Sequence, residues 1–241
     1  MNLQKIQHAI GRLSRAEREE LATWLADLWE GESPAGAVEE ARVAYAESSS
    51  RDMTVEEYLA FEEASPWRHE YIDGWVYAMS GATVAHNKLT FQLAKALSDR
   101  LSGGPCQVFL TDLKLRLQLG EDEIFYYPDV MVACRPEEWG RDFIRNPKVV
   151  AEVLSPSTRH IDQREKSLNY RRTAGIEEYI ILSQNDCRVL LHRREDRWRR
   201  RIVNGADAVL ELRSLGVALP LEEIYDGVQA GGTLASAPQK Q

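Results

Sequence analysis

The stretch that decides the fold runs from Val149 to Gly175 and reads VVAEVLSPSTRHIDQREKSLNYRRTAG. It begins as an apolar strand, yet it places a carboxylate, Glu152, beside Val150, Val153 and Leu154. Burying an unpaired charge is costly, so we expect this group to be paired, protonated or bound to a metal ion. The rest of the sequence has to decide among these three states.

A second carboxylate occupies a similar place earlier in the chain. In FYYPDVMVAC, residues 125–134, Asp129 follows Pro128 at the start of an apolar strand. Pro-Asp alone is common at strand starts, so an isolated instance is weak evidence for function. Two carboxylates on successive strands of one sheet, however, are able to share a hard divalent cation, which takes oxygen ligands and often keeps several waters.

The segment after Glu152 adds a cation. Asp162, Lys166 and Tyr170 are spaced i, i+4 and i+8 and so share one face of a helix. If that face looks back at the strand ends, the Lys166 ammonium can stabilise developing negative charge or orient an attacking water. The alternative is an Asp162–Lys166 ion pair on the surface with Tyr170 packed behind it, worth under ~1 kcal/mol.

The region from residue 52 to residue 230 predicts one α/β (α+β) domain, with a mixed sheet flanked by helices in the order α-β-β-β-α-β. Thr54 begins a short helix with a capping-box pattern, and Asp73-Gly74 marks the turn of a hairpin within HEYIDGWVYAMS, residues 69–80. The other expected elements are helices at 84–101 and 162–174 and strands at 107–117, 127–133, 149–154 and 178–182.

The flanking regions predict other roles. Residues 1–30 show the pattern of a helical hairpin, which we expect to act as a small interaction module. Residues 31–51 are rich in Gly, Pro, Ser and Ala and predict a linker, and residues 231–241 predict a flexible tail.

Composition restricts the classes of function. The net charge of −8 counts against a protein that coats nucleic acid by bulk electrostatics, although a local basic groove stays open. The sequence has no apolar run long enough for a membrane span and no signal-peptide pattern at its start, so we expect a cytoplasmic protein without a membrane partner. Cys106, Cys134 and Cys187 are far apart, which predicts three reduced thiols.

One basic run stands out in the acidic chain. RVLLHRREDRWRRRIV, residues 188–203, predicts two strands about a turn at Glu195-Asp196. Arg193, Arg197 and Arg199 are the candidates for contact with nucleic acid; charge on a solvated edge strand is the alternative explanation. The expected buried side consists of Val189, Leu191, Trp198 and Ile202.

Three segments together resemble a known family. HEYIDGWVYAMSGATVAHNKL, YYPDVMVAC and VVAEVLSPSTRHIDQREKSLNYRRTAGIEEYIIL are similar to the Uma-two family of putative restriction endonucleases, a branch of the PD-(D/E)XK nuclease superfamily. The resemblance extends from about Met53 to Val228. It implies a restriction-endonuclease-like fold, Mg²⁺-dependent hydrolysis of phosphodiester bonds, with Mn²⁺ as a substitute, and Asp129 and Glu152 as metal ligands.

The sequence departs from that superfamily at one position. The signature places lysine two residues after the second acid, where this chain has Leu154. In some branches the lysine has moved to the following helix, and Lys166 is placed to take that role. The expected arrangement has Asp129, Glu152 and the backbone carbonyl of Val153 around the ion, with Lys166 held by Asp162 and Tyr170.

Two further residues are supporting candidates. By resemblance, Glu70 corresponds to an acidic residue that many of these nucleases contribute from an N-terminal element; a charge at the hairpin edge is the alternative. His86 shares a helix stripe with Leu89, Leu93 and Leu97, so it should face inward. It is either a hydrogen-bonded core histidine or a group that faces the site.

The function predicted from the sequence is a metal-dependent endonuclease that acts on nucleic acid, DNA rather than RNA, and assembles as a homo-oligomer through the N-terminal hairpin. A nuclease-like scaffold for protein interaction, of the kind found in toxin–antitoxin components, is the alternative, and a structural metal-binding domain is a third reading. A nuclease should present Asp129, Glu152 and Lys166 around one cleft with a basic approach, whereas a scaffold should leave Lys166 pointing elsewhere.

Overall fold

The computed structural model of the chain describes residues 53–79, 81–154 and 165–228. All of them belong to one compact unit. The predicted hairpin at 1–30, the linker at 31–51 and the tail at 231–241 lie outside the described residues, and so does Asp162.

A six-stranded mixed sheet forms the centre of the unit. Its order is β11-β10-β9-β8-β6-β3, and β8 pairs with β9 in parallel while the other neighbours are antiparallel. The strands are β3 (Gln107–Leu110), β6 (Val130–Ala133), β8 (Val149–Val153), β9 (Glu178–Leu182), β10 (Arg188–Arg193) and β11 (Arg200–Asn204). The strand predicted at 178–182 is therefore confirmed with its bounds.

A second sheet of five strands accompanies it, so the prediction of a single mixed sheet was incomplete. Its order is β2-β1-β5-β4-β7, and β12 and β13 form a separate two-stranded sheet. The strands are β1 (His69–Ile72), β2 (Trp75–Ala78), β4 (Lys114–Leu119), β5 (Asp122–Tyr126), β7 (Phe143–Ile144), β12 (Val209–Leu212) and β13 (Val217–Pro220). A 3-10 turn, η1 (Pro136–Glu138), precedes β7.

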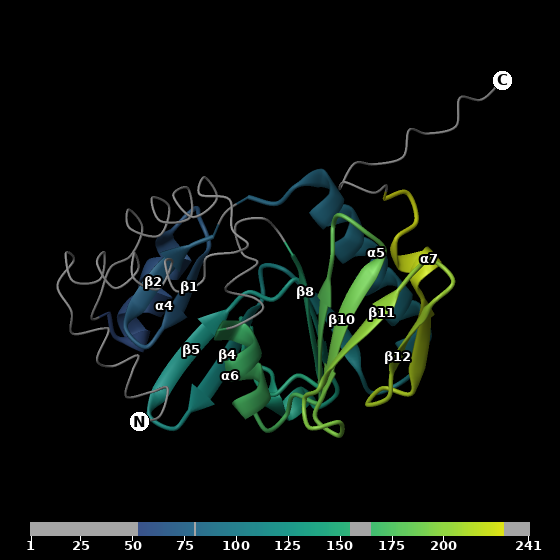
Figure 1. Cartoon of the computed structure of the whole chain (residues 1–241). Helices are drawn as coiled ribbons and strands as arrows, with labels where there is room; N and C mark the ends of the chain where they lie inside the picture. The colour runs from purple at the N-terminus through teal and green to yellow at the C-terminus, as the bar shows by residue number, and fades with distance from the viewer. Residues whose placement is uncertain (1–52, 80, 155–164, 229–241) are drawn as a thin grey trace, which may run out of the picture. The chain divides into compact units, whose positions relative to one another are not determined.

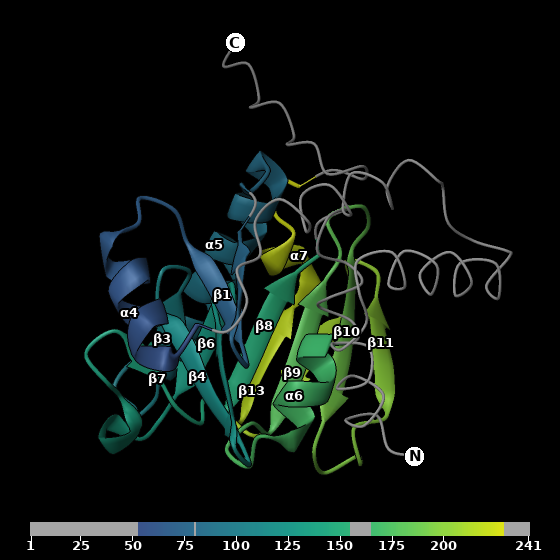
Figure 2. The ribbon, with the colours of Figure 1, turned by 90° about the vertical axis from the view of Figure 1, so that its left-hand side faces the viewer.

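The two faces of the six-stranded sheet pack against different layers (Figures 1 and 2). One face packs against α5 (Val84–Leu101), α7 (Leu221–Ile224) and the β12–β13 pair. The other face, which includes Val150 and Tyr179, packs against the five-stranded sheet and α6 (Ser167–Arg172). Because side chains alternate along a strand, Glu152 shares the face of Val150 and is directed toward α6.

The two longer helices follow their sequence signals. α4 (Val55–Ala64) begins after Thr54, whose side chain and that of Glu57 form the predicted capping box. In α5, Thr83 caps the first turn by accepting a hydrogen bond from the His86 amide. The stripe of Leu89, Leu93 and Leu97 is fully buried, which confirms the predicted inward face.

The strand predicted at 107–117 was wrong in its extent. The chain leaves β3 after Leu110 and enters β4 at Lys114, with Asp112 at a φ of 80° between them. This left-handed conformation is uncommon for a residue other than glycine. Because neither glycine nor proline occurs between Leu110 and Lys114, the sequence does not mark the break. The sequence analysis also missed β5 and the turn that precedes it.

Two cysteines also correct the sequence analysis. Cys106 and Cys134 form a disulfide with an S–S distance of 2.06 Å, and Cys187 is free. Gln107 pairs with Ala133 at the ends of β3 and β6, so the next residue outward on each strand is a cysteine. The sequence separation of 28 residues hides this proximity, which only the strand pairing creates.

Within the described part of the chain, no helix has the length and apolar character needed to cross a membrane.

Candidate active site

The opening question about Glu152 has a direct structural answer. Glu152 is 3% exposed, and its Oε1 lies 3.3 Å from the Nζ of Lys166. The same Nζ lies 2.9 Å from Oε1 of Glu70, which reaches it from β1. Glu152 is therefore paired, and the ammonium of Lys166 bridges carboxylates from two different sheets. Since Lys166 is 5% exposed, the reading of a surface ion pair for this lysine is wrong.

Tyr170 holds the same carboxylate. Its hydroxyl donates to Glu152 Oε1 over 2.9 Å, and Lys166 and Tyr170 thus act on one side chain, as their spacing predicts. Burial, and then the negative charge of Glu152, raises the pKa of Tyr170 well above its usual value. The hydroxyl consequently stays protonated and remains a donor at neutral pH.

Asp129 lies next to this cluster at the start of β6. Its Oδ2 accepts a hydrogen bond from the Val153 amide at 2.7 Å and lies 3.1 Å from the Nε2 of His86. Asp129 is thereby fixed to the residue that follows Glu152. Of the two readings of His86, the structure agrees with a side chain that faces the site.

Two residues that sequence reasoning missed complete the surroundings. The Nζ of Lys166 lies 5.3 Å from the ring centroid of Tyr126, which is fully buried. The Gln184 side chain donates to the Leu154 carbonyl at 2.6 Å and accepts from the Thr83 hydroxyl at 2.6 Å. Gln184 therefore ties the end of β8 to the start of α5. Tyr126 could have been found from the sequence, because it lies two residues before Pro128-Asp129. No sequence pattern marks Gln184 as a residue near the site.

The donor set fits a hard cation by its chemistry. Two carboxylates, those of Glu70 and Glu152, contact one ammonium, and the Val153 amide ties the carboxylate of Asp129 to the residue after Glu152, so the oxygens are of the kind that such a cation takes. Among the described residues no three or more His, Cys, Asp or Glu side chains converge as a ready-made metal cage. Mg²⁺ needs no such cage, since one or two carboxylates and several waters are its usual ligands.

The arginines predicted to contact nucleic acid do not reach this cluster. Arg193 is 4% exposed and its Nε lies 2.9 Å from Glu178 Oε1, so its assignment as a surface contact was wrong. Arg197 and Arg199 are exposed at the β10–β11 turn. That turn adjoins the Val149 end of the sheet, because Arg193 pairs with Glu178 and Glu178 with Val149, whereas Glu152 lies near the other end.

The predicted hairpin itself is confirmed, with one error in its buried side. β10 and β11 pair around the turn at residues 194–199. Val189 and Leu191 are buried, and Trp198 packs partly against the core. Ile202, however, is 57% exposed, because it faces outward on the edge strand β11.

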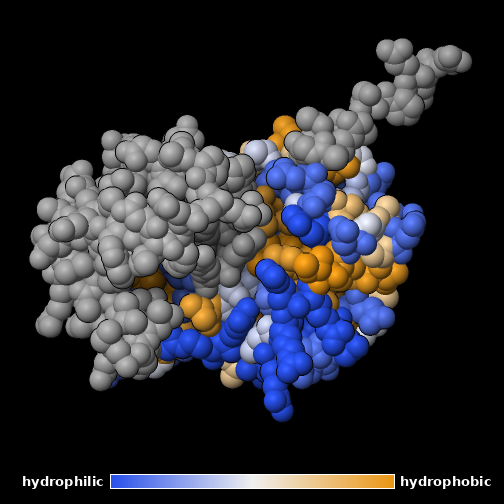
Figure 3. Space-filling model, viewed as in Figure 1, coloured by the Kyte–Doolittle hydropathy of each residue, from blue (hydrophilic) through white to orange (hydrophobic). Residues whose placement is uncertain are grey.

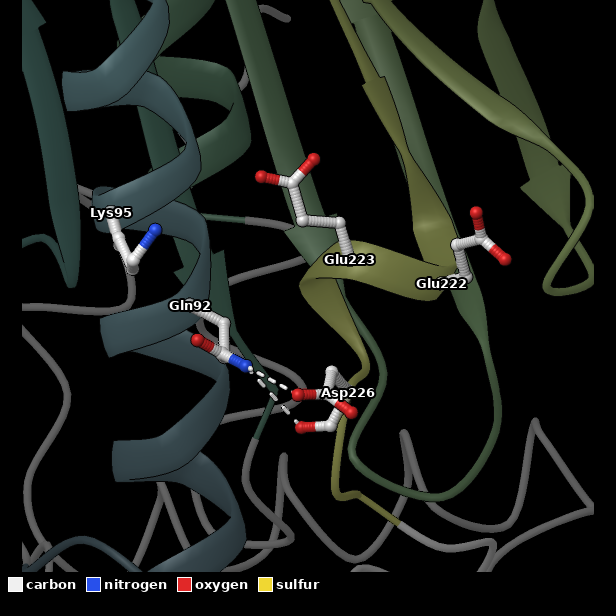
Figure 4. A pocket seen from close by; sticks show the side chains of 5 residues that line it. All are labelled: Gln92, Lys95, Glu222, Glu223 and Asp226. Carbon is white, nitrogen blue, oxygen red and sulfur yellow. Dashed lines mark hydrogen bonds between the residues drawn. The ribbon is translucent and has the colours of Figure 1, made fainter.

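A hollow elsewhere on the molecule does not coincide with the site. It has a volume of about 520 Å³ and lies between α5 and α7 (Figure 4). It is lined by Gln92, Lys95, Glu222, Glu223 and Asp226. None of the predicted site residues belongs to this lining.

Comparison with known proteins agrees with the architecture. The crystal structure of a putative nuclease belonging to DUF820, from Anabaena variabilis, matches with a TM-score of 0.58 over 72% of this chain and 97% of that chain. At 17% sequence identity this likeness shows the fold alone. The chain thus shares the mixed α+β fold of that protein.

The sequence relatives are more specific. The model of the Uma2 family, described as putative restriction endonuclease, matches residues 55–222, so the chain belongs to that family. One uncharacterized protein of Synechocystis is 34% identical over 178 residues, which are 73% of this chain and 93% of that protein. A second from the same organism is 32% identical over 145 residues, 59% of this chain and 81% of that protein.

Proposed function

We propose that the chain is a Mg²⁺-dependent endonuclease that hydrolyses phosphodiester bonds of nucleic acid, with DNA preferred to RNA. One observation carries the proposal: Lys166, from the segment after β8, brings its ammonium to Glu152 and to Glu70. A buried ammonium held between two carboxylates is the arrangement expected of a phosphoryl-transfer site and not of a scaffold. The family description and the name of the similar structure point to the same class of activity.

Asp129 and Glu152 are the residues that would hold the ion, together with the Val153 carbonyl. Both contacts of Asp129, to the Val153 amide and to His86, fall on its Oδ2. When bound, Mg²⁺ supplies charge for the phosphate oxygens and a water of lowered pKa. His86 would orient the Asp129 carboxylate, in the manner of residues that support metal ligands.

The remaining steps belong to the chain itself. Lys166 would give its charge to the phosphate or orient the attacking water, because an ammonium on a flexible stem is able to move between carboxylate and substrate. Tyr170 holds Glu152 and so limits how far that carboxylate follows the lysine. Glu70 keeps Lys166 inside the site, because its Oε1 lies 2.9 Å from the Nζ of Lys166. It also accepts from the Tyr127 amide at 3.2 Å, which links β1 to the segment before Asp129.

Cleavage assays test this proposal. Purified protein is incubated with supercoiled plasmid, single-stranded DNA and RNA in Mg²⁺, in Mn²⁺ and with a chelator. We expect metal-dependent cleavage by the wild type and its loss, by about 10³-fold or more, in Asp129→Ala and Glu152→Gln. Glu222→Gln serves as the matched control, because Glu222 is an exposed acid on α7 away from the cluster.

The outcomes separate the assignments. If Asp129→Ala cleaves as fast as the wild type, the assigned ligands are wrong. If the wild type cleaves nothing but binds Mg²⁺ and Glu152→Gln does not, the metal assignment is supported and the enzyme assignment fails. If wild type and Glu152→Gln bind the ion equally, the scaffold alternative becomes the better account.

A further inference from the structure

A second basic cluster lies where α6 meets the β10–β11 hairpin. The Nη2 of Arg171, on α6, lies 3.3 Å from the Nδ1 of His192 on β10. Arg200 on β11 is directly opposite His192 in the antiparallel register, and opposite residues of such a pair project from the same face. Two guanidinium groups therefore flank one imidazole on the face of the sheet that carries α6.

Neither Arg171 nor Arg200 lies within ion-pair distance of an acid among the described residues, whereas Arg193 pairs with Glu178, Arg201 with Asp196 and Arg213 with Glu195. Arg172, Arg194, Arg197 and Arg199 share this property, so it does not by itself single out the two arginines. The Nε of Arg171 is moreover buried and lacks a hydrogen-bond partner in the described part of the chain. A buried donor without a partner is costly, so the simplest explanation is that a ligand supplies the missing acceptor.

The electrostatics of the cluster agree with this geometry. Burial lowers the pKa of Arg171. Burial also lowers the pKa of His192, and the positive charges of Arg171 and Arg200 lower it further, while the Trp198 carbonyl, 3.2 Å from Nδ1, acts in the opposite direction. The two cations repel each other, and an anion between them would relieve that repulsion.

We propose that Arg171, Arg200 and His192 form a phosphate-binding site that holds the nucleic-acid backbone beside the candidate active site. The inference rests on the proposed function and adds the contact that binds the substrate. Guanidinium groups match phosphate oxygens with paired N–H donors, and contacts of this kind position nucleic acid without reading its sequence. The site would also provide a local basic surface on a chain whose overall charge is −8.

The site has the right relation to the catalytic cluster. Arg171 follows Tyr170, whose hydroxyl donates to Glu152, and lies five positions after Lys166. At 1.5 Å per helical residue this corresponds to roughly 7 Å along the helix axis, so α6 and its N-cap residue carry both groups on one short segment.

Charge on an edge strand explains part of the cluster but not all of it. Arg200 lies on β11, at the edge of the sheet, where arginine commonly prevents strand pairing between molecules. Arg171 is on a helix and half-buried, so this explanation does not apply to it. Figure 3 shows that a strongly hydrophilic surface extends over the lower part of the β10–β11 hairpin as seen in Figure 1.

Binding without catalysis tests the proposal. The full chain, with EDTA to prevent cleavage, is titrated into a fluorescent DNA duplex while anisotropy is recorded at several salt concentrations. We expect Arg171→Gln and Arg200→Gln each to weaken binding by about tenfold. Each should also reduce the slope of log affinity against log salt by about 0.9, since one phosphate contact is lost.

The control removes an equal charge elsewhere. Lys95→Gln alters an exposed lysine of α5, in the layer on the opposite face of the six-stranded sheet, where it pairs with Asp99 at 2.6 Å. Its affinity and salt slope should match those of the wild type. Melting temperatures establish that each variant is folded; should Arg171→Gln unfold, Arg200→Gln carries the test, because Arg200 is exposed.

The outcomes are separable from those of the cleavage assay. Unchanged affinity and slope in both arginine variants would overturn the phosphate site, even if the wild type cleaves DNA. Absence of duplex binding by the wild type at low salt would overturn it as well, and so would binding of inorganic phosphate without binding of the duplex. Weaker binding in the arginine variants with normal binding by Glu152→Gln supports the site, whether or not cleavage is found.

Discussion

Two buried carboxylates on neighbouring strands of the central sheet have opposite surroundings. Glu178 on β9 accepts from Arg193 Nε at 2.9 Å, from the Arg213 amide at 3.1 Å, and from the Ser214 amide and hydroxyl at 3.1 and 2.6 Å. Glu152 on β8 instead meets the side chains of Lys166 and Tyr170, and Lys166 is shared with Glu70.

The difference separates a structural ion pair from a candidate site. Around Glu178, backbone amides and a planar guanidinium fix both oxygens, so the pair is electrically balanced and geometrically closed. Around Glu152, an ammonium on a flexible stem is shared with Glu70, and the other printed contact comes from a tyrosine hydroxyl and not from backbone amides. Burial of an acid is therefore a poor sign of function by itself; a flexible cation that is shared between two acids is a better sign.

The largest expected effect breaks the balanced pair. Arg193→Ala would leave Glu178 buried without its cation, which costs about 3–5 kcal/mol of unfolding free energy. Urea unfolding followed by circular dichroism measures this loss, and Mg²⁺ should not restore it. Arg201→Ala is the control: the Arg201 side chain is 52% exposed, and Asp196 keeps Arg193 as a second partner, so the loss should be under ~1 kcal/mol. A similar small loss in both variants would contradict the structural role of Glu178.

The next effect concerns the cluster around Glu152. Lys166→Met should lower the cleavage rate by about 10²–10³-fold, because one electrostatic group facing the phosphate is lost. In a chelator the variant should also be less stable than the wild type, since Glu70 and Glu152 lose their shared ammonium. Mg²⁺ should recover much of that stability by binding only the folded state.

Recovery by Mg²⁺ is therefore the property that distinguishes the two carboxylates. Unfolding curves of Lys166→Met and Arg193→Ala are compared with and without the ion under equal conditions. Recovery in both or in neither would mean that the two surroundings do not differ as their contacts indicate.

Sequence reasoning located one of these clusters and not the other. Spacing of four residues placed Lys166 and Tyr170 on one face, and the apolar run around Glu152 marked it as unusual, so the contact could be inferred locally. The Glu178–Arg193 pair depends on which strands are neighbours, since the two residues face each other across β9 and β10. Arg193 was consequently assigned to the surface.

Similar reasons explain the other successes and errors of the fold prediction. α5 was delimited correctly because Thr83 caps it and its apolar stripe is continuous. The five-stranded sheet was missed because β1 pairs with β5, about fifty positions later in the chain, and no local pattern encodes that pairing. The Cys106–Cys134 disulfide was missed for the same cause. Local signals thus defined the elements, and long-range pairing decided the surroundings of each charge.

The smallest expected effect sharpens the comparison at a single hydrogen bond. Tyr170→Phe removes the 2.9 Å contact to Glu152, which should cost about 1 kcal/mol of unfolding free energy. Because the raised pKa of Tyr170 favours the protonated hydroxyl in the folded state, its contribution is complete below the ordinary value of 10.0 and falls as the pH rises above it. The variant should therefore lose less stability than the wild type in alkaline solution.

The matched control separates packing from support of the site. Tyr225 is also buried, with its hydroxyl donating to the Arg188 carbonyl at 2.7 Å, but it packs in the layer of α5 and α7. Tyr225→Phe should cost a similar free energy and leave Mg²⁺ affinity unchanged, whereas Tyr170→Phe should weaken Mg²⁺ binding about tenfold, as loss of a group that orients a metal ligand does. Calorimetric titration of both variants measures this. Equal affinities would place Tyr170 with Tyr225, as a packing residue, and would remove it from the candidate active site.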